Sequence, residues 1–100
     1  MDGPRDPTLS GSEQAFDAER PYALHPQVAI RPEPFGGLAY NYESRRLTLI
    51  TARPLVDVVH ALADHPTARA AVTAHVAAPD HGRYETALAT LYDSGVIRAR

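Results

Sequence analysis

The stretch "RRLTLITARPLVDVVHAL", Arg45–Leu62, contains the change of pattern on which the fold depends. Its first part places Leu47 and Leu49 on alternate positions, the period of two that is typical of a β-strand. Pro54 suits the first turn of a helix, because the N–H that proline lacks has no partner there. From that point the apolar side chains follow the spacing i, i+3, i+4 and i+7 of a helix: Leu55, Val58, Val59 and Leu62.

Two further strands are predicted before this stretch. Val28 and Ile30 alternate with polar neighbours, and two prolines stop that strand. Gly36 and Gly37 then permit a tight turn or bulge, after which alternate apolar residues over 38–42 indicate a second strand. The short connection "NYES" favours antiparallel pairing of this strand with the third, Arg46–Thr51.

Two further helices are predicted after Leu62. Thr67 can cap the helix "ARAAVTAHVAA", and "RYETALATLYDSG" places Tyr84, Ala87, Leu88 and Leu91 on one face of the next. Gly95 is suited to end that helix in a left-handed conformation, and Val96 and Ile97 are expected to pack as a short tail or strand. The order β-β-β-α-α-α predicts an α+β domain with a three-stranded antiparallel sheet, in a winged-helix-like arrangement.

The domain is predicted to span residues 21–100. Residues 1–20 combine Gly, Pro, Ser and acidic residues with few apolar side chains. Such a composition buries too little surface to offset the entropy of ordering, so we expect a flexible tail.

Composition narrows the classes of function. The chain has 100 residues, a net charge of −2 and no cysteine, so it offers no general basic field for nucleic acid and no thiolate metal site. It contains no apolar run of about 18 residues, and its N-terminus lacks the pattern of a secretory signal. We therefore expect no membrane contact and a cytoplasmic location.

Catalytic motifs are absent from the sequence. There is no HExxH, no GxSxG and no phosphate-binding glycine loop, and the five histidines are not spaced as metal ligands. The third predicted helix has one arginine, Arg83, against Glu85 and Asp93, a weak set for reading DNA. The sequence predicts a protein that is not an enzyme, with no cofactor and no metal; a winged-helix DNA-binding module remains the alternative.

The edge of the third strand raises the question of a partner. Residues 46–51 contain no proline and no central charge, so nothing in them blocks the addition of another strand. Residues 96–99 or the tail could cover this edge, or a strand of another molecule could pair with it, including a second copy of the chain. The residues alone leave these alternatives open.

The motifs "RPEPFGGLAYN", "RRLTLI" and "LATLYDSGVI" resemble those of the peptide chaperones of the mycofactocin system. These belong to the precursor-peptide recognition domains, a class typified by the pyrroloquinoline-quinone peptide chaperone. The similarity spans about residues 22–98. It implies a domain similar to a winged helix, with three strands and three helices. It also implies binding of the leader of a ribosomally made precursor peptide, and contact with a radical S-adenosylmethionine enzyme that modifies the far end of the peptide.

The resemblance also implies where the leader would bind. It would add antiparallel to the third strand and lie against the third helix, about Arg83–Asp93. The residues expected at this site are Arg45, Arg46, Leu47, Thr48, Leu49, Ile50, Thr51, Arg83, Leu88 and Tyr92. The backbone of Leu47, Thr48, Leu49 and Ile50 would pair with the leader. The arginines would face acidic leader residues, and Leu88 and Tyr92 would line apolar pockets. A monomer is expected, with an edge-strand dimer as the alternative.

Overall fold

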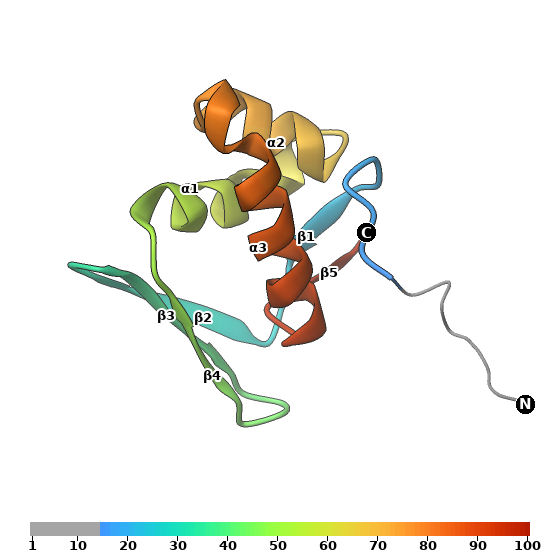
Figure 1. The fold of residues 1–100 in the computed structure, drawn as a ribbon. Coiled ribbons are helices and arrows are strands. Elements are labelled where there is room, and N and C mark those ends of the chain that lie inside the picture. The colour runs from blue at the N-terminus through green and yellow to red at the C-terminus, as the bar shows by residue number, and fades with distance from the viewer. Residues whose placement is uncertain (1–14) are drawn as a thin grey trace, which may run out of the picture.

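Three helices lie on one face of an antiparallel sheet in the computed structural model, which describes residues 15–100 (Figure 1). The strands are β1 (Tyr22–Leu24), β2 (Val28–Glu33), β3 (Gly36–Asn41), β4 (Leu47–Ile50) and β5 (Ile97–Ala99). The helices are α1 (Arg53–Ala61), α2 (Ala68–His75) and α3 (His81–Asp93), with short 3₁₀ turns η2 (Leu62–Asp64) and η3 (Ala78–Asp80). The predicted α+β class and the three helices are confirmed.

The strands form two sheets rather than one. β2, β3 and β4 pair antiparallel in that order, as predicted for the three sequential strands. β1 pairs antiparallel with β5, so that Tyr22 lies opposite Ala99 and Leu24 opposite Ile97. The prediction of three strands was therefore wrong in number. A short strand at Val96 and Ile97 was considered, but β1 was missed, because three residues are too few to show an alternating pattern.

The core forms between the inner face of β2–β4 and the apolar stripes of the helices. The predicted stripe of α1 and η2 is confirmed, since Leu55, Val58, Val59 and Leu62 are all buried. Other elements contribute smaller buried groups: Val28, Ala39 and Ile50 from the sheet, Ala68, Ala71 and Val72 from α2, and Leu88 and Leu91 from α3. The short side chains of α2 bring that helix close to its neighbours.

Two predicted helix ends are confirmed. The Thr67 hydroxyl oxygen accepts a hydrogen bond from the Ala70 N–H at 3.0 Å, which satisfies a donor that the first turn of α2 leaves without a partner. Gly95 follows α3 with a φ of +81°, the left-handed conformation that terminates many helices.

Gly36 lets the β2–β3 hairpin approach the end of β4. Its φ is +149°, and a Cβ atom built there would lie 2.0 Å from the Ile50 carbonyl oxygen. No other residue fits this position without movement of the backbone. The predicted role of this glycine in a tight turn is confirmed.

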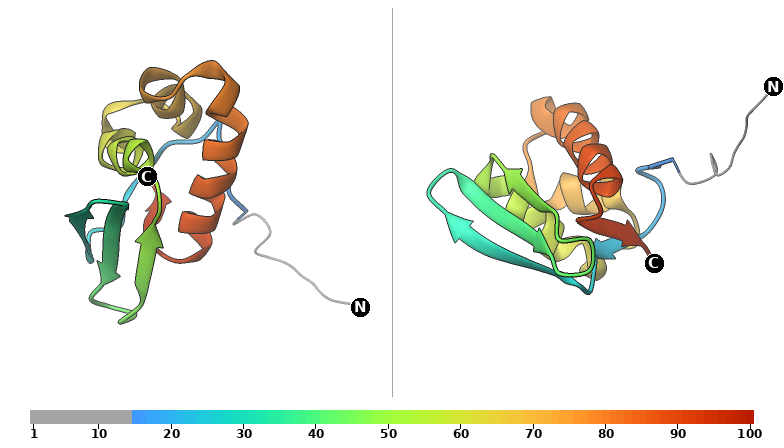
Figure 2. Two further views of the ribbon diagram at one scale, coloured as in Figure 1. Left: turned by 60° about the vertical axis from the view of Figure 1, so that its left-hand side comes forward. Right: turned by 90° about the horizontal axis from the view of Figure 1, so that it is seen from below.

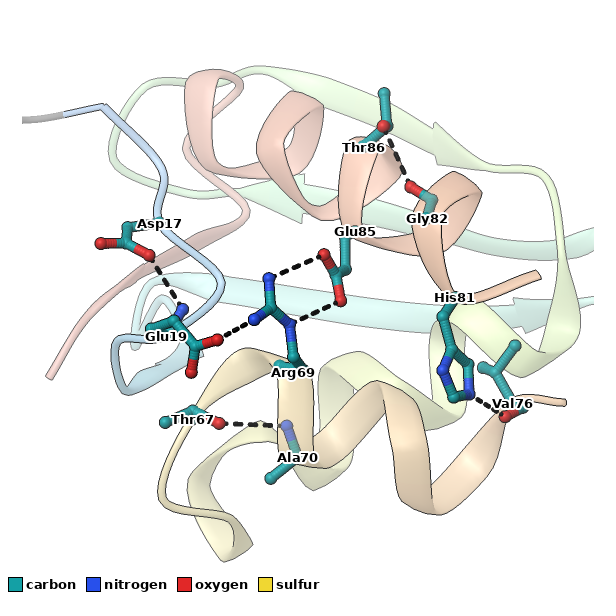
Figure 3. Close-up of polar contacts among 10 residues, drawn as sticks. All are labelled: Asp17, Glu19, Thr67, Arg69, Ala70, Val76, His81, Gly82, Glu85 and Thr86. Atoms are coloured by element: carbon teal, nitrogen blue, oxygen red, sulfur yellow. Dashed lines mark hydrogen bonds and ion pairs between the residues drawn. The ribbon is translucent and has the colours of Figure 1, made fainter. Parts of the chain in front are cut away.

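Residues 15–20 lie against α2 and α3, although the sequence places them in a flexible tail. The Phe16 ring stacks on Tyr22 at 4.8 Å between centroids, and the Arg69 N–H donates to the Ala18 carbonyl oxygen at 2.9 Å. Figure 3 shows the Arg69 guanidinium between the carboxylates of Glu19 and Glu85. The hydrogen bond to Glu85, together with its charge, raises the pKa of Arg69 above its ordinary value. The remainder of the predicted tail, residues 1–14, lies outside the described residues.

The helices of the described residues are short. Over residues 15–100, none has both the length and the apolar character that a membrane span needs.

Candidate functional site

The outer edge of β4 has no paired strand within residues 15–100. β4 pairs with β3 on one side only, where Leu47 lies opposite Tyr40 and Ile50 opposite Gly37. Residues 96–99, one of the segments considered as a cover for this edge, contribute β5 and pair with β1 instead. Within the described chain, this edge is open to another strand.

The register identifies the backbone groups that face the open edge. The Asn41 N–H donates to the Arg46 carbonyl oxygen at 2.9 Å, so Arg46 points its backbone groups toward β3. Orientation alternates along an antiparallel strand, so Thr48 and Ile50 also point toward β3. The N–H and C=O groups of Leu47 and Leu49 therefore face away from β3, toward the open edge. The expectation that the backbones of Thr48 and Ile50 also pair with a leader was wrong, because alternate residues of a strand face opposite sides.

The side chains of β4 divide between the two faces of the sheet. Ile50 is 1% exposed and belongs to the core, and Thr48 is half-buried on the same inner face. Leu47 and Leu49 point to the opposite face and are 60% and 59% exposed. A strand added at this edge would meet apolar side chains on both faces.

A cleft lies where the end of β4 and the start of α1 approach α3. Its volume is about 260 Å³, and it is lined by Thr51, Ala52 and Leu55 on one side and Arg83, Tyr84 and Ala87 on the other. Figure 2 shows β4 running alongside α3, with the open edge of the strand toward the helix. The cleft is large enough to hold an apolar side chain of an added strand.

Arginines lie at both ends of the open edge. Arg45 and Arg46 are exposed at the start of β4, and Arg45 adopts a φ of +65°, which is uncommon for a residue with a side chain. At the other end, the Arg83 guanidinium is 2.8 Å from an Asp80 carboxylate oxygen and lies over the Tyr84 ring. The Arg83 charge is thus partly compensated, whereas no ion pair to Arg45 or Arg46 forms among residues 15–100.

Two of the residues expected at the site lie elsewhere in the structure. Leu88 has no exposed surface and packs in the core. Tyr92 lies on the other flank of α3, with its ring 5.5 Å from Tyr22 and 6.3 Å from Phe16. Tyr84 and Ala87, which the sequence assigns only to the apolar stripe, line the cleft instead. A small residue within a stripe of larger ones is the signal that could have identified Ala87.

Asn41 has a role that the sequence does not reveal. It is 4% exposed, and its Oδ1 accepts from the N–H groups of Glu43 and Ser44 at 2.8 and 3.0 Å. Its Nδ2 donates to the Gly95 carbonyl oxygen at 3.0 Å, across 54 positions of sequence. This side chain fixes the β3–β4 turn against the end of α3, and so sets the position of the open edge relative to the helix.

Metal-binding side chains do not gather in the part of the chain that the structure describes. Over residues 15–100, no three His, Asp or Glu side chains are arranged to hold an ion.

Comparison with known proteins assigns the chain to a family. The model of the peptide chaperone MftB family matches residues 21–98, which include the open edge of β4, the cleft and all of α3. The chain belongs to the MftB peptide chaperone family. This agrees with the resemblance carried by the three sequence motifs.

This chain is similar to curated MftB proteins over most of their length. The Peptide chaperone MftB of Mycolicibacterium smegmatis is 45% identical over 91 residues, which are 90% of this chain and 89% of the relative. The proteins of the same name from Mycobacterium ulcerans and Mycobacterium tuberculosis are 44% and 43% identical, over 83% and 85% of this chain and 77% and 79% of their own length. No solved structure shows significant similarity to this MftB-family chain.

Proposed function

We propose that this chain is a non-catalytic peptide chaperone of mycofactocin biosynthesis that acts in the cytoplasm. It binds the leader of a ribosomally synthesised precursor peptide by β-strand addition and presents the peptide to a radical S-adenosylmethionine enzyme. The observation that carries this proposal is the open edge of β4 beside the cleft against α3. Membership of the MftB family supports the peptide as the partner.

Strand addition uses the backbone for affinity and the side chains for specificity. The outward N–H and C=O groups of Leu47 and Leu49 would pair with the leader backbone. Alternate leader side chains would then point inward and outward. An inward apolar side chain would enter the cleft beside Tyr84 and Ala87, and outward ones would lie next to Leu47 and Leu49.

An antiparallel leader would have a fixed direction on this edge. Its N-terminal part would lie beside Thr51 and Arg83, and its C-terminal part beside Arg45 and Arg46. Acidic leader residues at these two ends would be attracted to the arginines, an interaction that salt weakens. The rest of the precursor would leave from the Arg45–Arg46 end, away from the cleft.

The role requires tethering rather than chemistry by this chain. A bound leader keeps the far end of the precursor within reach of an enzyme that contacts the chaperone. The effective concentration of that end near the enzyme is then set by the length of the connecting peptide, and reaches the millimolar range for short flexible connections.

NMR titration of the labelled protein with the isolated leader peptide tests the proposal. We expect the amide resonances of Leu47, Leu49 and Thr51 to shift most, because these N–H groups gain new partners. Those of Thr48 and Ile50, already paired with β3, should shift less. A leader of scrambled sequence is the control. Saturable binding without shifts at Leu47 and Leu49 would place the peptide elsewhere and contradict strand addition.

A further inference from the structure

Three of the four large apolar side chains that are exposed among residues 15–100 lie on one surface. Among residues 15–100, the exposed ones are Phe35, Tyr42, Leu47 and Leu49, and all four belong to the three-stranded sheet or its turns. The helices bury their apolar side chains against the core. A contiguous apolar surface on one side of a small domain indicates a contact with another molecule.

The register defines this surface, which we call the outer face. Tyr40 lies between Ala29 of β2 and Leu47 of β4, and Leu38 lies between Arg31 and Leu49. The Tyr42 ring packs edge-on against Tyr40 at 4.8 Å. The outer face thus consists of Ala29, Leu38, Tyr40, Tyr42, Leu47 and Leu49, with Arg31 at its margin. Figures 1 and 2 show all three helices on the opposite side of the sheet.

We propose that the outer face docks the enzyme that modifies the peptide, through an apolar patch on the surface of that enzyme. This inference rests on the proposed function. It assigns the enzyme, the second partner in that function, to a surface other than the peptide-binding edge of β4. Tyrosine and arginine are enriched at protein interfaces, and a shallow hollow of about 580 Å³ lies over Tyr40 and Leu38, where an apolar side chain of the partner can enter. The Arg31 guanidinium at the margin is held by Glu33 at 2.7 Å, so the face presents little uncompensated charge.

The size of the outer face argues against a second copy of the chain as its occupant. Three strands spaced about 4.8 Å apart and about 20 Å long give a surface on the order of 300 Å². A stable interface buries about 800 Å² on each partner. The outer face is therefore suited to a transient contact, one that requires a second attachment to persist.

The peptide supplies that second attachment. A leader strand on the edge of β4 would continue the outer face, because its outward side chains would lie beside Leu47 and Leu49. The far end of the same peptide would occupy the enzyme. The two weak contacts then reinforce each other, so the loaded chaperone binds the enzyme more tightly than the empty one.

Two substitutions test this assignment. Ala29→Glu places a charge on the outer face at an exposed position of β2, about 10 Å from the peptide edge, and Tyr40→Thr removes the central ring while keeping a strand-forming residue. Ala74→Glu makes the same change at an exposed position of α2 and serves as the matched control. Affinity for the fluorescent leader alone is measured first, and then binding to the purified radical enzyme with saturating full-length precursor.

We expect Ala29→Glu and Tyr40→Thr to weaken binding to the enzyme by about tenfold or more, with leader affinity unchanged within about twofold. Ala74→Glu should leave both affinities unchanged. The proposal would be overturned if both outer-face variants bound the enzyme as tightly as the wild type. It would also be overturned if these variants lost as much affinity for the leader as for the enzyme. Sedimentation that shows a dimer of the wild type, converted to monomer by Ala29→Glu, would assign the face to a second copy instead. If the wild type fails to bind the leader, the proposed function itself fails.

Discussion

Asn41 connects the two parts of the proposed peptide site. Its amide bonds the β3–β4 turn on one side and the Gly95 carbonyl at the end of α3 on the other. Neither contact is visible from neighbouring sequence, since "NYES" indicates only a turn. This buried side chain therefore joins the turn that leads into β4 to the end of α3.

Replacement of Asn41 by alanine tests this role. Asn41→Ala removes three hydrogen bonds made by a buried side chain, so we expect the free energy of unfolding to fall by about 2 kcal/mol. Urea denaturation measures the change. Ser44→Ala, at an exposed position of the same turn, should change stability by less than about 0.5 kcal/mol. Equal effects of the two substitutions would mean that the amide has no special role.

Arg45 combines an unfavourable backbone conformation with a candidate contact. Glycine accepts a φ of +65° without steric cost but makes the unfolded chain more flexible, so Arg45→Gly should change the free energy of unfolding by less than about 1 kcal/mol. Loss of the charge should weaken leader binding about two- to fivefold at low salt, and less at high salt. Fluorescence anisotropy gives the affinities. Arg45→Lys keeps the charge and should bind the leader as tightly as the wild type. If it loses as much affinity as the glycine variant, the charge of Arg45 does not account for its contribution to leader binding.

At the scale of the elements, alternate residues of β4 direct their backbone groups toward β3 and toward the open edge. The N–H of Leu49 faces the open edge, and that of Thr48 pairs with β3. The same substitution at these adjacent positions should therefore have different consequences.

Leu49→Pro should leave the β3–β4 ladder intact while it removes one donor from the open edge and places a ring in the path of the leader. We expect the variant to fold, as judged by circular dichroism, and to lose leader affinity by at least about tenfold. Leu49→Thr keeps the N–H and controls for loss of the leucine side chain. Thr48→Pro breaks a ladder bond and should destabilise the fold by about 3 kcal/mol. A folded Leu49→Pro variant with wild-type affinity would rule out strand addition at β4.

How much the sequence predicts depends on where the partner of each element lies. α1 and β4 carry clear periods of their own, and both were predicted correctly. β1 and β5 are three residues long and pair from opposite ends of the described chain, so no local pattern marks them as a pair. The apolar stripe of α3 correctly predicted that Leu88 is buried. Which flank of α3 faces β4 depends on packing between the elements, and in the structure Ala87 rather than Leu88 lines the cleft.

At the scale of the whole molecule, the two faces of the three-stranded sheet differ in role. The inner face, with Val28, Ala39 and Ile50, belongs to the core beneath the helices. The outer face exposes Leu47 and Leu49. The edge of β4 lies between the two faces, so an added strand would contact the core side and the exposed side at once. The proposed peptide site and the proposed docking surface would thus adjoin each other on one small domain.

The pairing of β1 with β5 has a consequence for the order of events during synthesis. Tyr22 emerges early from the ribosome, but its partner Ala99 is among the last residues of the described chain to be made. Contacts between residues so distant in sequence form slowly, because a long loop must close first. α3, which precedes β5 directly, also emerges late. The α3 side of the cleft is therefore among the last parts of the described chain to be made, and the proposed peptide site would be complete only after α3 has folded.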